Sequence, residues 1–283
     1  MVYDKENWTY NDETKILQIK RVKELRHYMF ECFNHYFGVF RNHREYKVII
    51  PDSVVLIANS CFQNMDAKEY VLPNSIKEIG LSVFYDNPCL KVIQWPSSVK
   101  NISEHAFEYC KGLREIVLPE GIEMICDYAF DGCQLLKKIT IPSTVVEIND
   151  NAFQCCYNLK RIQLQEGLQY IGKFAFYCCG LEKIVIPTTV EELGEYVFTD
   201  CKNLKEIHVP RALYRKYVYS YFKSNTHAEV IPYDEPMNLS TNTIAKPEII
   251  TANTIETTTT SKREFKSFNG VIRTNLIANK KKK

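Results

Sequence analysis

Cysteine is the residue type whose spacing most strongly suggests chemistry in this chain, because thiolates bind zinc and act as nucleophiles or redox groups. Five cysteines recur at a nearly constant interval, at Cys110, Cys133, Cys156, Cys179 and Cys201. The same column holds Met65 and Asn87 in two earlier units. A position that accepts methionine and asparagine favours packing or backbone bonding over a metal site, since small free thiols are often buried. We therefore predict buried, reduced cysteines here and no metal ligands.

Two adjacent pairs, Cys155-Cys156 and Cys178-Cys179, leave a second interpretation open. In each pair the second residue belongs to the buried column, and the first should face elsewhere. Cys155 and Cys178 lie in neighbouring units, so a redox or zinc role would need them to approach each other. Their spacing matches no zinc-finger pattern, and a structural role is preferred.

The histidines and the other reactive groups form no recognisable catalytic motif. Cys32 and His35, with His27 and His43 nearby, are the best remaining candidates for a metal site, but they lie in an aromatic-rich segment where packing is preferred. We find no nucleophile elbow, phosphate-binding loop or paired-carboxylate motif. We predict no enzyme activity, no catalytic residue and no cofactor, although distant repeats could still assemble a site.

The elements that would position any of these residues belong to an internal repeat. Prolines recur at every twenty-second or twenty-third position, with Gln165 in the one missing place, and a phenylalanine follows each of the first seven positions at a fixed offset of eleven. The prolines are Pro51, Pro73, Pro96, Pro119, Pro142, Pro187 and Pro210, and the phenylalanines are Phe62, Phe84, Phe107, Phe130, Phe153, Phe176 and Phe198. A constant offset over so many units predicts a solenoid of stacked repeats.

A single repeat can be interpreted physically from residues 113–133. From Ile116 to Pro119, apolar and exposed positions alternate until the proline, which predicts a short strand with one buried face. A second apolar pair follows within Ile122 to Ile125, and Ala129 to Cys133 suits a turn or short helix. No unit can bury these groups alone, so we expect parallel ladders with a continuous core between the units.

The repeat resembles the BspA-like class of leucine-rich repeats, whose unit runs Leu-x-x-Ile-x-Ile-Pro, then Val-x-x-Ile, then Ala-Phe-x-x-Cys. The pattern is carried by Leu136, Ile139, Ile141, Pro142, Val145, Ile148, Ala152, Phe153 and Cys156, and the resemblance covers about 47–210. It implies a leucine-rich-repeat solenoid, α/β and horseshoe-like, with short parallel strands and short helical turns. It also implies non-enzymatic roles in adhesion and protein recognition, since many relatives are surface antigens of bacteria and protists.

We expect caps at both ends of the repeats and a tail after them. The expected segments are an N-terminal cap (1–46), leucine-rich repeats (47–210), a C-terminal cap (211–235) and a disordered basic tail (236–283) with nine cations and three acids. The first cap would hold a hairpin over 7–19 and an amphipathic helix over roughly 21–37, where Val22, Leu25 and Met29 keep a helical period. Part of this helix could instead be a degenerate repeat. The resemblance implies a closing helix and strand in the second cap.

Composition and charge limit the class and the location of the protein. The 283 residues are 45% hydrophobic with a formal net charge of +2, so the whole chain carries no general attraction for nucleic acid. The first fifteen residues are polar and lack the apolar core of a secretory signal, and no apolar run is long enough to span a membrane. Eleven cysteines without an export signal suit a reducing compartment. We expect a cytoplasmic location; the cell surface follows from the resemblance alone, and the terminal lysines leave the nucleus open.

Charges on the exposed side of the first strand are the most informative for function. In early and late repeats a base is followed by an acid, as in Arg114-Glu115, which suggests that neighbours pair. The middle repeats gather cations on adjacent rungs instead. This basic patch and its polar neighbours comprise Lys137, Lys138, Thr140, Lys160, Arg161, Gln163 and Lys183. One interpretation is a consensus preference for lysine at exposed positions, and the other is a site for an acidic partner.

We expect a non-enzymatic protein-binding scaffold that presents the basic patch to an acidic protein and has no small-molecule substrate. One alternative, from the resemblance, is a cell-surface adhesin or antigen. Another is a nuclear or nucleic-acid-associated factor that acts through the tail, which ends in Lys280 to Lys283.

Overall fold

The computed structural model describes residues 2–4, 8–11, 13–20, 22–26, 46–217 and 227–234. The chain forms two compact units, Met1–Met237 and Asn238–Lys283, and every described residue belongs to the first. The predicted tail over 236–283 therefore lies outside the described residues. Within the described ranges, no helix is long and apolar enough to cross a membrane.

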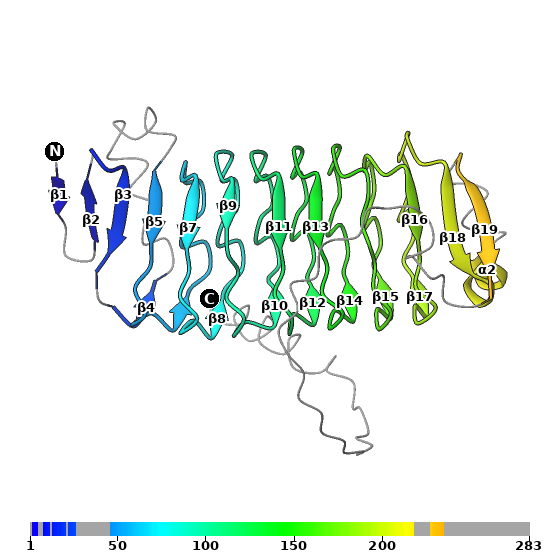
Figure 1. Cartoon of the computed structure of the whole chain (residues 1–283), viewed down its shortest axis with the longest axis horizontal. Coiled ribbons are helices and arrows are strands. Elements are labelled where there is room, and N and C mark those ends of the chain that lie inside the picture. Colours follow the sequence, from blue (N-terminus) through cyan, green and yellow to red (C-terminus); the bar gives the residue numbers. More distant parts are fainter. Residues whose placement is uncertain are drawn as a thin grey trace, which may run out of the picture. The chain divides into compact units, whose positions relative to one another are not determined.

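Two ladders of short parallel strands run along the first unit, with one strand of each ladder in most repeats (Figure 1). The first ladder contains Ile16–Ile19 (β3), Lys47–Ile49 (β5), Glu69–Val71 (β7), Val92–Ile93 (β9), Glu115–Val117 (β11), Lys138–Thr140 (β13), Lys183–Val185 (β16), Glu206–Pro210 (β18) and Glu229–Tyr233 (β19). The second ladder contains Glu24–Leu25 (β4), Leu56–Ile57 (β6), Glu78–Ile79 (β8), Asn101–Ile102 (β10), Met124–Ile125 (β12), Glu147–Ile148 (β14), Tyr170–Ile171 (β15) and Glu192–Leu193 (β17). The alternating apolar positions of the sequence are the inward-facing positions of these strands.

The N-terminal end differs from the sequence expectation in one element. Val2–Asp4 (β1), Trp8–Asn11 (β2) and β3 form an antiparallel meander, and β3 then pairs in parallel with β5. The helix expected from residue 21 is wrong at its start, because β4 is a strand that pairs in parallel with β6. Val22 and Leu25 are three residues apart, which fits a helix but also fits the Val-x-x-Ile spacing of the second strand. The degenerate-repeat alternative accounts for this segment, and residues 27–45 lie outside the described part.

A column of stacked phenylalanines runs through the core between the ladders. The seven repeat phenylalanines are at most 3% exposed, and neighbouring ring centroids are 5.2 to 5.9 Å apart with nearly parallel planes. The spacing is close to the separation of paired strands, about 4.8 Å. Each interior ring is therefore covered on both faces by the rings of the neighbouring rungs.

The third side of each repeat is a turn, which is one of the two forms that the sequence allowed. Backbone donors here point to the next rung: Phe130 N donates to Ala152 O at 2.8 Å, and Phe153 N donates to Ala175 O at 2.8 Å. The chain reaches this geometry through residues of positive φ such as Tyr128 (56°) and Asn151 (58°). These inter-rung bonds use groups that a helix would pair within itself, so the turns form a third ladder.

At the C-terminal end, a helix and a strand follow the last repeat. Arg211–Tyr217 (α2) buries Leu213, and β19 pairs with β18 in parallel register from Glu206↔Glu229 to Pro210↔Tyr233. An ion pair between Arg211 and Asp234, at 2.6 Å, links the start of the helix to the segment after the strand. Residues 218–226, where the expected helix would have continued, lie outside the described residues.

Two buried carboxylates lie on the turn side of the middle repeats. Asp131 is 4% exposed and Glu108 is 7% exposed. Burial, with a further contribution from Glu108, raises the pKa of Asp131 to about 6. His105 Nδ1 is hydrogen-bonded to Glu108, and Gln154 Nε2 donates to Asp131 at 3.5 Å. The ionised form of Asp131 is therefore disfavoured in the folded protein.

Replacing Phe153 with alanine should lower the free energy of unfolding by about 3–5 kcal/mol, because the cavity removes contacts with two stacked rings. Equilibrium unfolding in urea measures the effect. The control is Tyr157→Ala, since this ring in the same repeat is 51% exposed and its loss should change stability by about 0.5 kcal/mol or less. Equal losses in the two variants would contradict the stacked-column account.

Replacing Asp131 with asparagine should flatten the pH dependence of stability. The folded protein binds the Asp131 proton more tightly than the unfolded chain does, because its pKa rises from 3.8 to about 6 on folding. Stability from this group is therefore present at low pH and is lost as the pH rises through about 6. The free energy of unfolding is measured at about pH 4.5 and at about pH 7.5. Its decrease from the lower to the higher pH should be larger in the wild type than in Asp131→Asn. Asp52→Asn, at an exposed aspartate, serves as the control, and pH profiles of wild type and Asp131→Asn that run parallel would refute the assignment.

Candidate functional site

The residues predicted to bind a partner lie on the outward side of the first ladder. Lys138 and Thr140 belong to β13, Lys183 begins β16, and the rung from Lys160 to Gln163 lies between them in the chain without regular strand pairing. Their inward neighbours Ile139, Ile162 and Ile184 are buried. The strand period of two turns the predicted residues on either side of these isoleucines outward, whereas Lys137 and Lys160 lie one position before the alternating pattern. All seven are exposed except Lys183, which is half-buried.

Ion pairs divide the basic patch into engaged and available cations. Lys160 Nζ lies 3.2 Å from Glu182, and Lys183 Nζ lies 2.8 Å from Glu206. Hydrogen bonds from Lys183 and His208 hold the pKa of the Glu206 carboxyl at about 2. Among the described residues, no carboxylate lies within 4 Å of the charged groups of Lys137, Lys138 or Arg161. These three cations can pair with carboxylates or phosphates of a partner without first breaking an ion pair within the chain.

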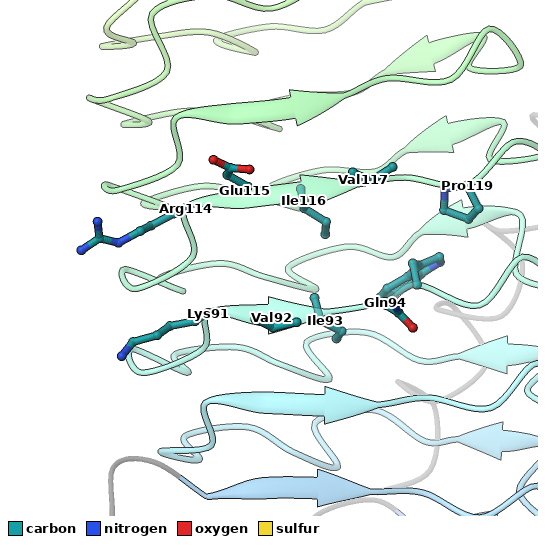
Figure 2. Close-up of a pocket in the computed structure, with 10 residues that line it drawn as sticks. Lys91, Val92, Ile93, Gln94, Arg114, Glu115, Ile116, Val117 and Pro119 are labelled. Carbon is teal, nitrogen blue, oxygen red and sulfur yellow. The ribbon is translucent and has the colours of Figure 1, made fainter. Parts of the chain in front are cut away.

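The expectation that neighbouring base and acid pair along one strand is wrong in the early repeats. Glu69 pairs with Lys47 of the preceding rung, at 2.7 Å, and not with Lys68 beside it. Arg114 and Glu115 extend in different directions (Figure 2). Successive side chains of a strand diverge, whereas equivalent positions of adjacent rungs are close, so charges pair between rungs.

Two further cations, Lys91 and Arg114, were missed by the sequence argument. Both are exposed, and neither has an ion-pair partner in the part of the chain that the structure describes. They occupy the same column as Lys137, one position after each strand-opening leucine. Following this column alone, instead of pairing each base with the next acid, would have identified them.

A shallow groove of about 690 Å³ lies on the outer face between β9 and β11 (Figure 2). Its lining comprises Lys91, Val92, Ile93, Gln94, Trp95, Arg114, Glu115, Ile116, Val117 and Pro119. Val92 and Val117 are 49% and 67% exposed, so the groove combines apolar surface with cations. It lies next to the basic patch, because Lys137 N donates to Arg114 O at 2.8 Å.

The cysteine column bonds to the backbone. Each Sγ donates to the carbonyl oxygen of the phenylalanine in the preceding rung, at 2.9 to 3.2 Å, for Cys110, Cys133, Cys156, Cys179 and Cys201. Asn87 makes the same contact, from Nδ2 to Phe62 O at 2.7 Å. Burial raises the pKa of the Cys133 thiol well above its usual range, so the thiol form is maintained. The column is therefore a set of S–H donors inside the core.

The second cysteine candidates, Cys155 and Cys178, are half-buried and free on the turn side. Cys155 N donates to Tyr177 O at 2.9 Å, so their rungs are adjacent there. Burial raises the pKa of Cys178, with a further contribution from Cys155, and this keeps the thiol protonated. The other candidates, His27, Cys32, His35 and His43, lie outside the described residues. Within the described ranges, no group of three potential ligands is placed to hold a metal ion.

Several solved structures are similar to this chain, and two of them align with it over about two thirds of its length or more. A leucine-rich cell surface protein from Faecalibacterium prausnitzii aligns with a TM-score of 0.54 and 26% identity over 73% of this chain and 54% of that one. A leucine-rich repeat protein from Eubacterium ventriosum aligns with a TM-score of 0.53 and 21% identity over 66% of this chain and 51% of that one. This chain thus spans about half the length of each. No curated protein matches it significantly.

The BspA type leucine rich repeat region matches the chain in six copies, over residues 36–156 and 123–246. These ranges cover well over half of the sequence and include all the complete repeats. The match confirms the predicted leucine-rich-repeat solenoid, whose family and fold are those of repeat scaffolds. The chain belongs to the BspA-type leucine-rich-repeat family.

Proposed function

We propose that this chain is a non-enzymatic interaction scaffold that binds an acidic protein surface through the first ladder. One observation carries the proposal: Lys137, Lys138 and Arg161 are exposed on neighbouring rungs and have no carboxylate partner among the described residues. Thr140 and Gln163 lie between them and offer hydrogen bonds. Lys160 and Lys183 border this group, and each already pairs with a glutamate.

The repulsion between unpaired cations on adjacent rungs favours binding of an acidic partner at this surface. Two like charges about 5 Å apart in water repel by on the order of 0.8 kcal/mol, and salt reduces this. The repeat relieves such repulsion elsewhere with a glutamate on the next rung, as it does for Lys47, Lys160 and Lys183. At Lys137, Lys138 and Arg161 it does not. Carboxylates from an acidic protein would complete the same cross-rung pattern and would also accelerate association.

Reversing two of these charges, in Lys138→Glu/Arg161→Glu, should weaken binding of acidic proteins by about tenfold or more at low salt and less at high salt. Proteins captured from the source cells are identified by quantitative mass spectrometry at about 50 mM and about 300 mM salt. The acidic ones are then measured individually for Kd. The expected losses fall on acidic proteins and diminish as salt rises.

A matched control makes the same change in net charge elsewhere. Lys77→Glu/Lys202→Glu reverses two exposed lysines, one beside β8 of the second ladder and one in the turn after Cys201. This variant should retain the partners. The proposal fails if both variants lose the same proteins, or if neither loses any.

A cell-surface role is a second candidate function, favoured by the structural neighbour from Faecalibacterium prausnitzii. That protein is described as a leucine-rich cell surface protein, and it is 26% identical over 73% of this chain. An adhesin could use the same outward face toward acidic groups on another cell. The two candidates differ in location, which can be measured directly.

Labelling intact source cells with a membrane-impermeant biotin reagent distinguishes these locations. Exposed lysines such as Lys137 and Lys138 should become labelled without lysis if the protein is displayed at the surface. Labelling only after lysis, with a known surface protein as positive control, would reject the adhesin and direct the partner search to the cell interior.

A further inference from the structure

The first ladder is interrupted between β9 and β11, and again at the rung from Lys160 to Gln163. β9 pairs with β7 and β11 pairs with β13, but β9 and β11 share no hydrogen-bonded register. On either side, Lys91 N donates to Lys68 O at 2.9 Å and Lys137 N donates to Arg114 O at 2.8 Å. The equivalent bond from Arg114 N to Lys91 O is absent from this described segment. The groove lies over this break.

Trp95 distinguishes this break from the one at residues 160–163, where Leu164 takes the equivalent position. Its position is the residue before the repeat proline, where the other complete repeats place Ile50, Leu72, Leu118, Ile141, Ile186 and Val209. The indole packs edge-on against Phe107, with ring centroids 5.4 Å apart, and needs more space than an aliphatic chain. Trp95 is 5% exposed, and its Nε1–H has no hydrogen-bond acceptor among the described residues. Trp95 is also one of the residues that line the groove.

The outer surface of the groove is more apolar than the repeat pattern would give. Val92 and Val117 are the two most exposed aliphatic side chains in the described ranges. Val92 takes a column that other rungs fill with charged residues, such as Glu115 and Lys138. Exposed valines beside a buried tryptophan form an apolar surface that a partner's side chain can cover.

Charge selects the ligand class for this groove. Lys91 and Arg114 extend from neighbouring strands toward the same end of it (Figure 2). Neither has an ion-pair partner in the described part of the chain, and Lys137 continues the row on the next rung. Glu115 also lines the groove, which thus presents an apolar centre, a cationic end and one carboxylate. The valines and the two cations complement an aliphatic side chain flanked by carboxylates.

The geometry also limits how a ligand can lie. Cα atoms of β9 and β11 still approach within 8 Å. A strand inserted between them would need about 9.6 Å, twice the usual separation of about 4.8 Å. The ligand therefore lies across the outer face instead of completing the ladder.

We propose that the groove between β9 and β11 is a subsite for an extended acidic peptide segment, whose aliphatic side chain packs on Val92 and Val117 while its carboxylates pair with Lys91 and Arg114. This inference rests on the proposed function and gives the acidic partner a specific feature. A backbone or side-chain oxygen of the segment that reached Trp95 would supply the acceptor that the indole lacks.

The test selects peptides from a displayed random nonapeptide library against the full-length protein at low salt. Enriched peptides should share an aliphatic residue flanked by aspartate or glutamate. Binding of one synthetic peptide of this kind is then followed by Trp95 fluorescence in a Trp8→Phe background, since Trp8 and Trp95 are the two tryptophans of the chain. A saturable change in emission is the expected result. Enrichment of peptides without this pattern, or no change in Trp95 emission, overturns the proposal.

Variants then locate the peptide. Val92→Ser/Val117→Ser should weaken the peptide's Kd by about tenfold, because it removes apolar contact without changing charge. Lys91→Glu/Arg114→Glu should weaken it further at low salt. Val55→Ser/Leu81→Ser removes exposed aliphatic groups elsewhere and should have no effect. Unchanged binding in both groove variants, with all variants folded by circular dichroism, overturns the proposal.

Two further experiments distinguish this subsite from binding on the basic patch and from binding of a small amphiphile. Peptide affinity within about threefold of wild type in Lys138→Glu/Arg161→Glu supports a distinct subsite, whether or not that variant still binds acidic proteins. Loss of protein partners in that variant with intact peptide binding locates the proposed function on the patch. Sodium decanoate is titrated in parallel. A Trp95 response to decanoate but to none of the selected peptides overturns the peptide proposal in favour of a small amphiphile.

Discussion

Each interior repeat buries its phenylalanine between the rings that the rungs on either side supply. The rings repeat at 5.2 to 5.9 Å, and backbone groups on three sides bond between the same rungs. The spacing of the rings must agree with the spacing of the hydrogen-bonded rungs, because a rung that slipped would lose its ring stacking and its hydrogen bonds together. This constraint explains why the repeat keeps a nearly constant length while its outward positions vary freely.

The cysteine column shows how strictly the inward positions are determined. A carbonyl oxygen of the preceding phenylalanine faces this position in successive rungs, and from Asn87 onward a small donor satisfies it inside the core. Cysteine supplies an S–H of suitable size, and Asn87 supplies an amide while accepting the Tyr70 hydroxyl at 2.7 Å. Residues that look reactive in the sequence are thus part of the scaffold. Recognition is left to the outward positions, which stacking does not constrain.

Sequence reasoning succeeded where a residue's role is repeated and failed where the role depends on a neighbouring rung. Columns of proline, phenylalanine and cysteine predict the ladder because each repetition adds an independent observation of the same environment. Val22 and Leu25 occur once, and their spacing of three fits both a helix and the second strand of a repeat. Glu69 pairs with Lys47, one full repeat away, and this choice over adjacent Lys68 follows from register, which a single repeat does not reveal.

The interruption beside Trp95 is also a feature that depends on a neighbouring rung and that one repeat does not reveal. One large side chain in a column of aliphatic residues lies where the strand pairing between two repeats is lost, and this coincidence is visible only when rungs are stacked. A perfectly regular ladder would offer many equivalent places for a ligand to bind in shifted registers. The break beside Trp95, with Val92 on one side and Val117 on the other, removes that equivalence. In a solenoid built by repetition, departures from the repeat are therefore the positions at which one binding register can be preferred over its neighbours.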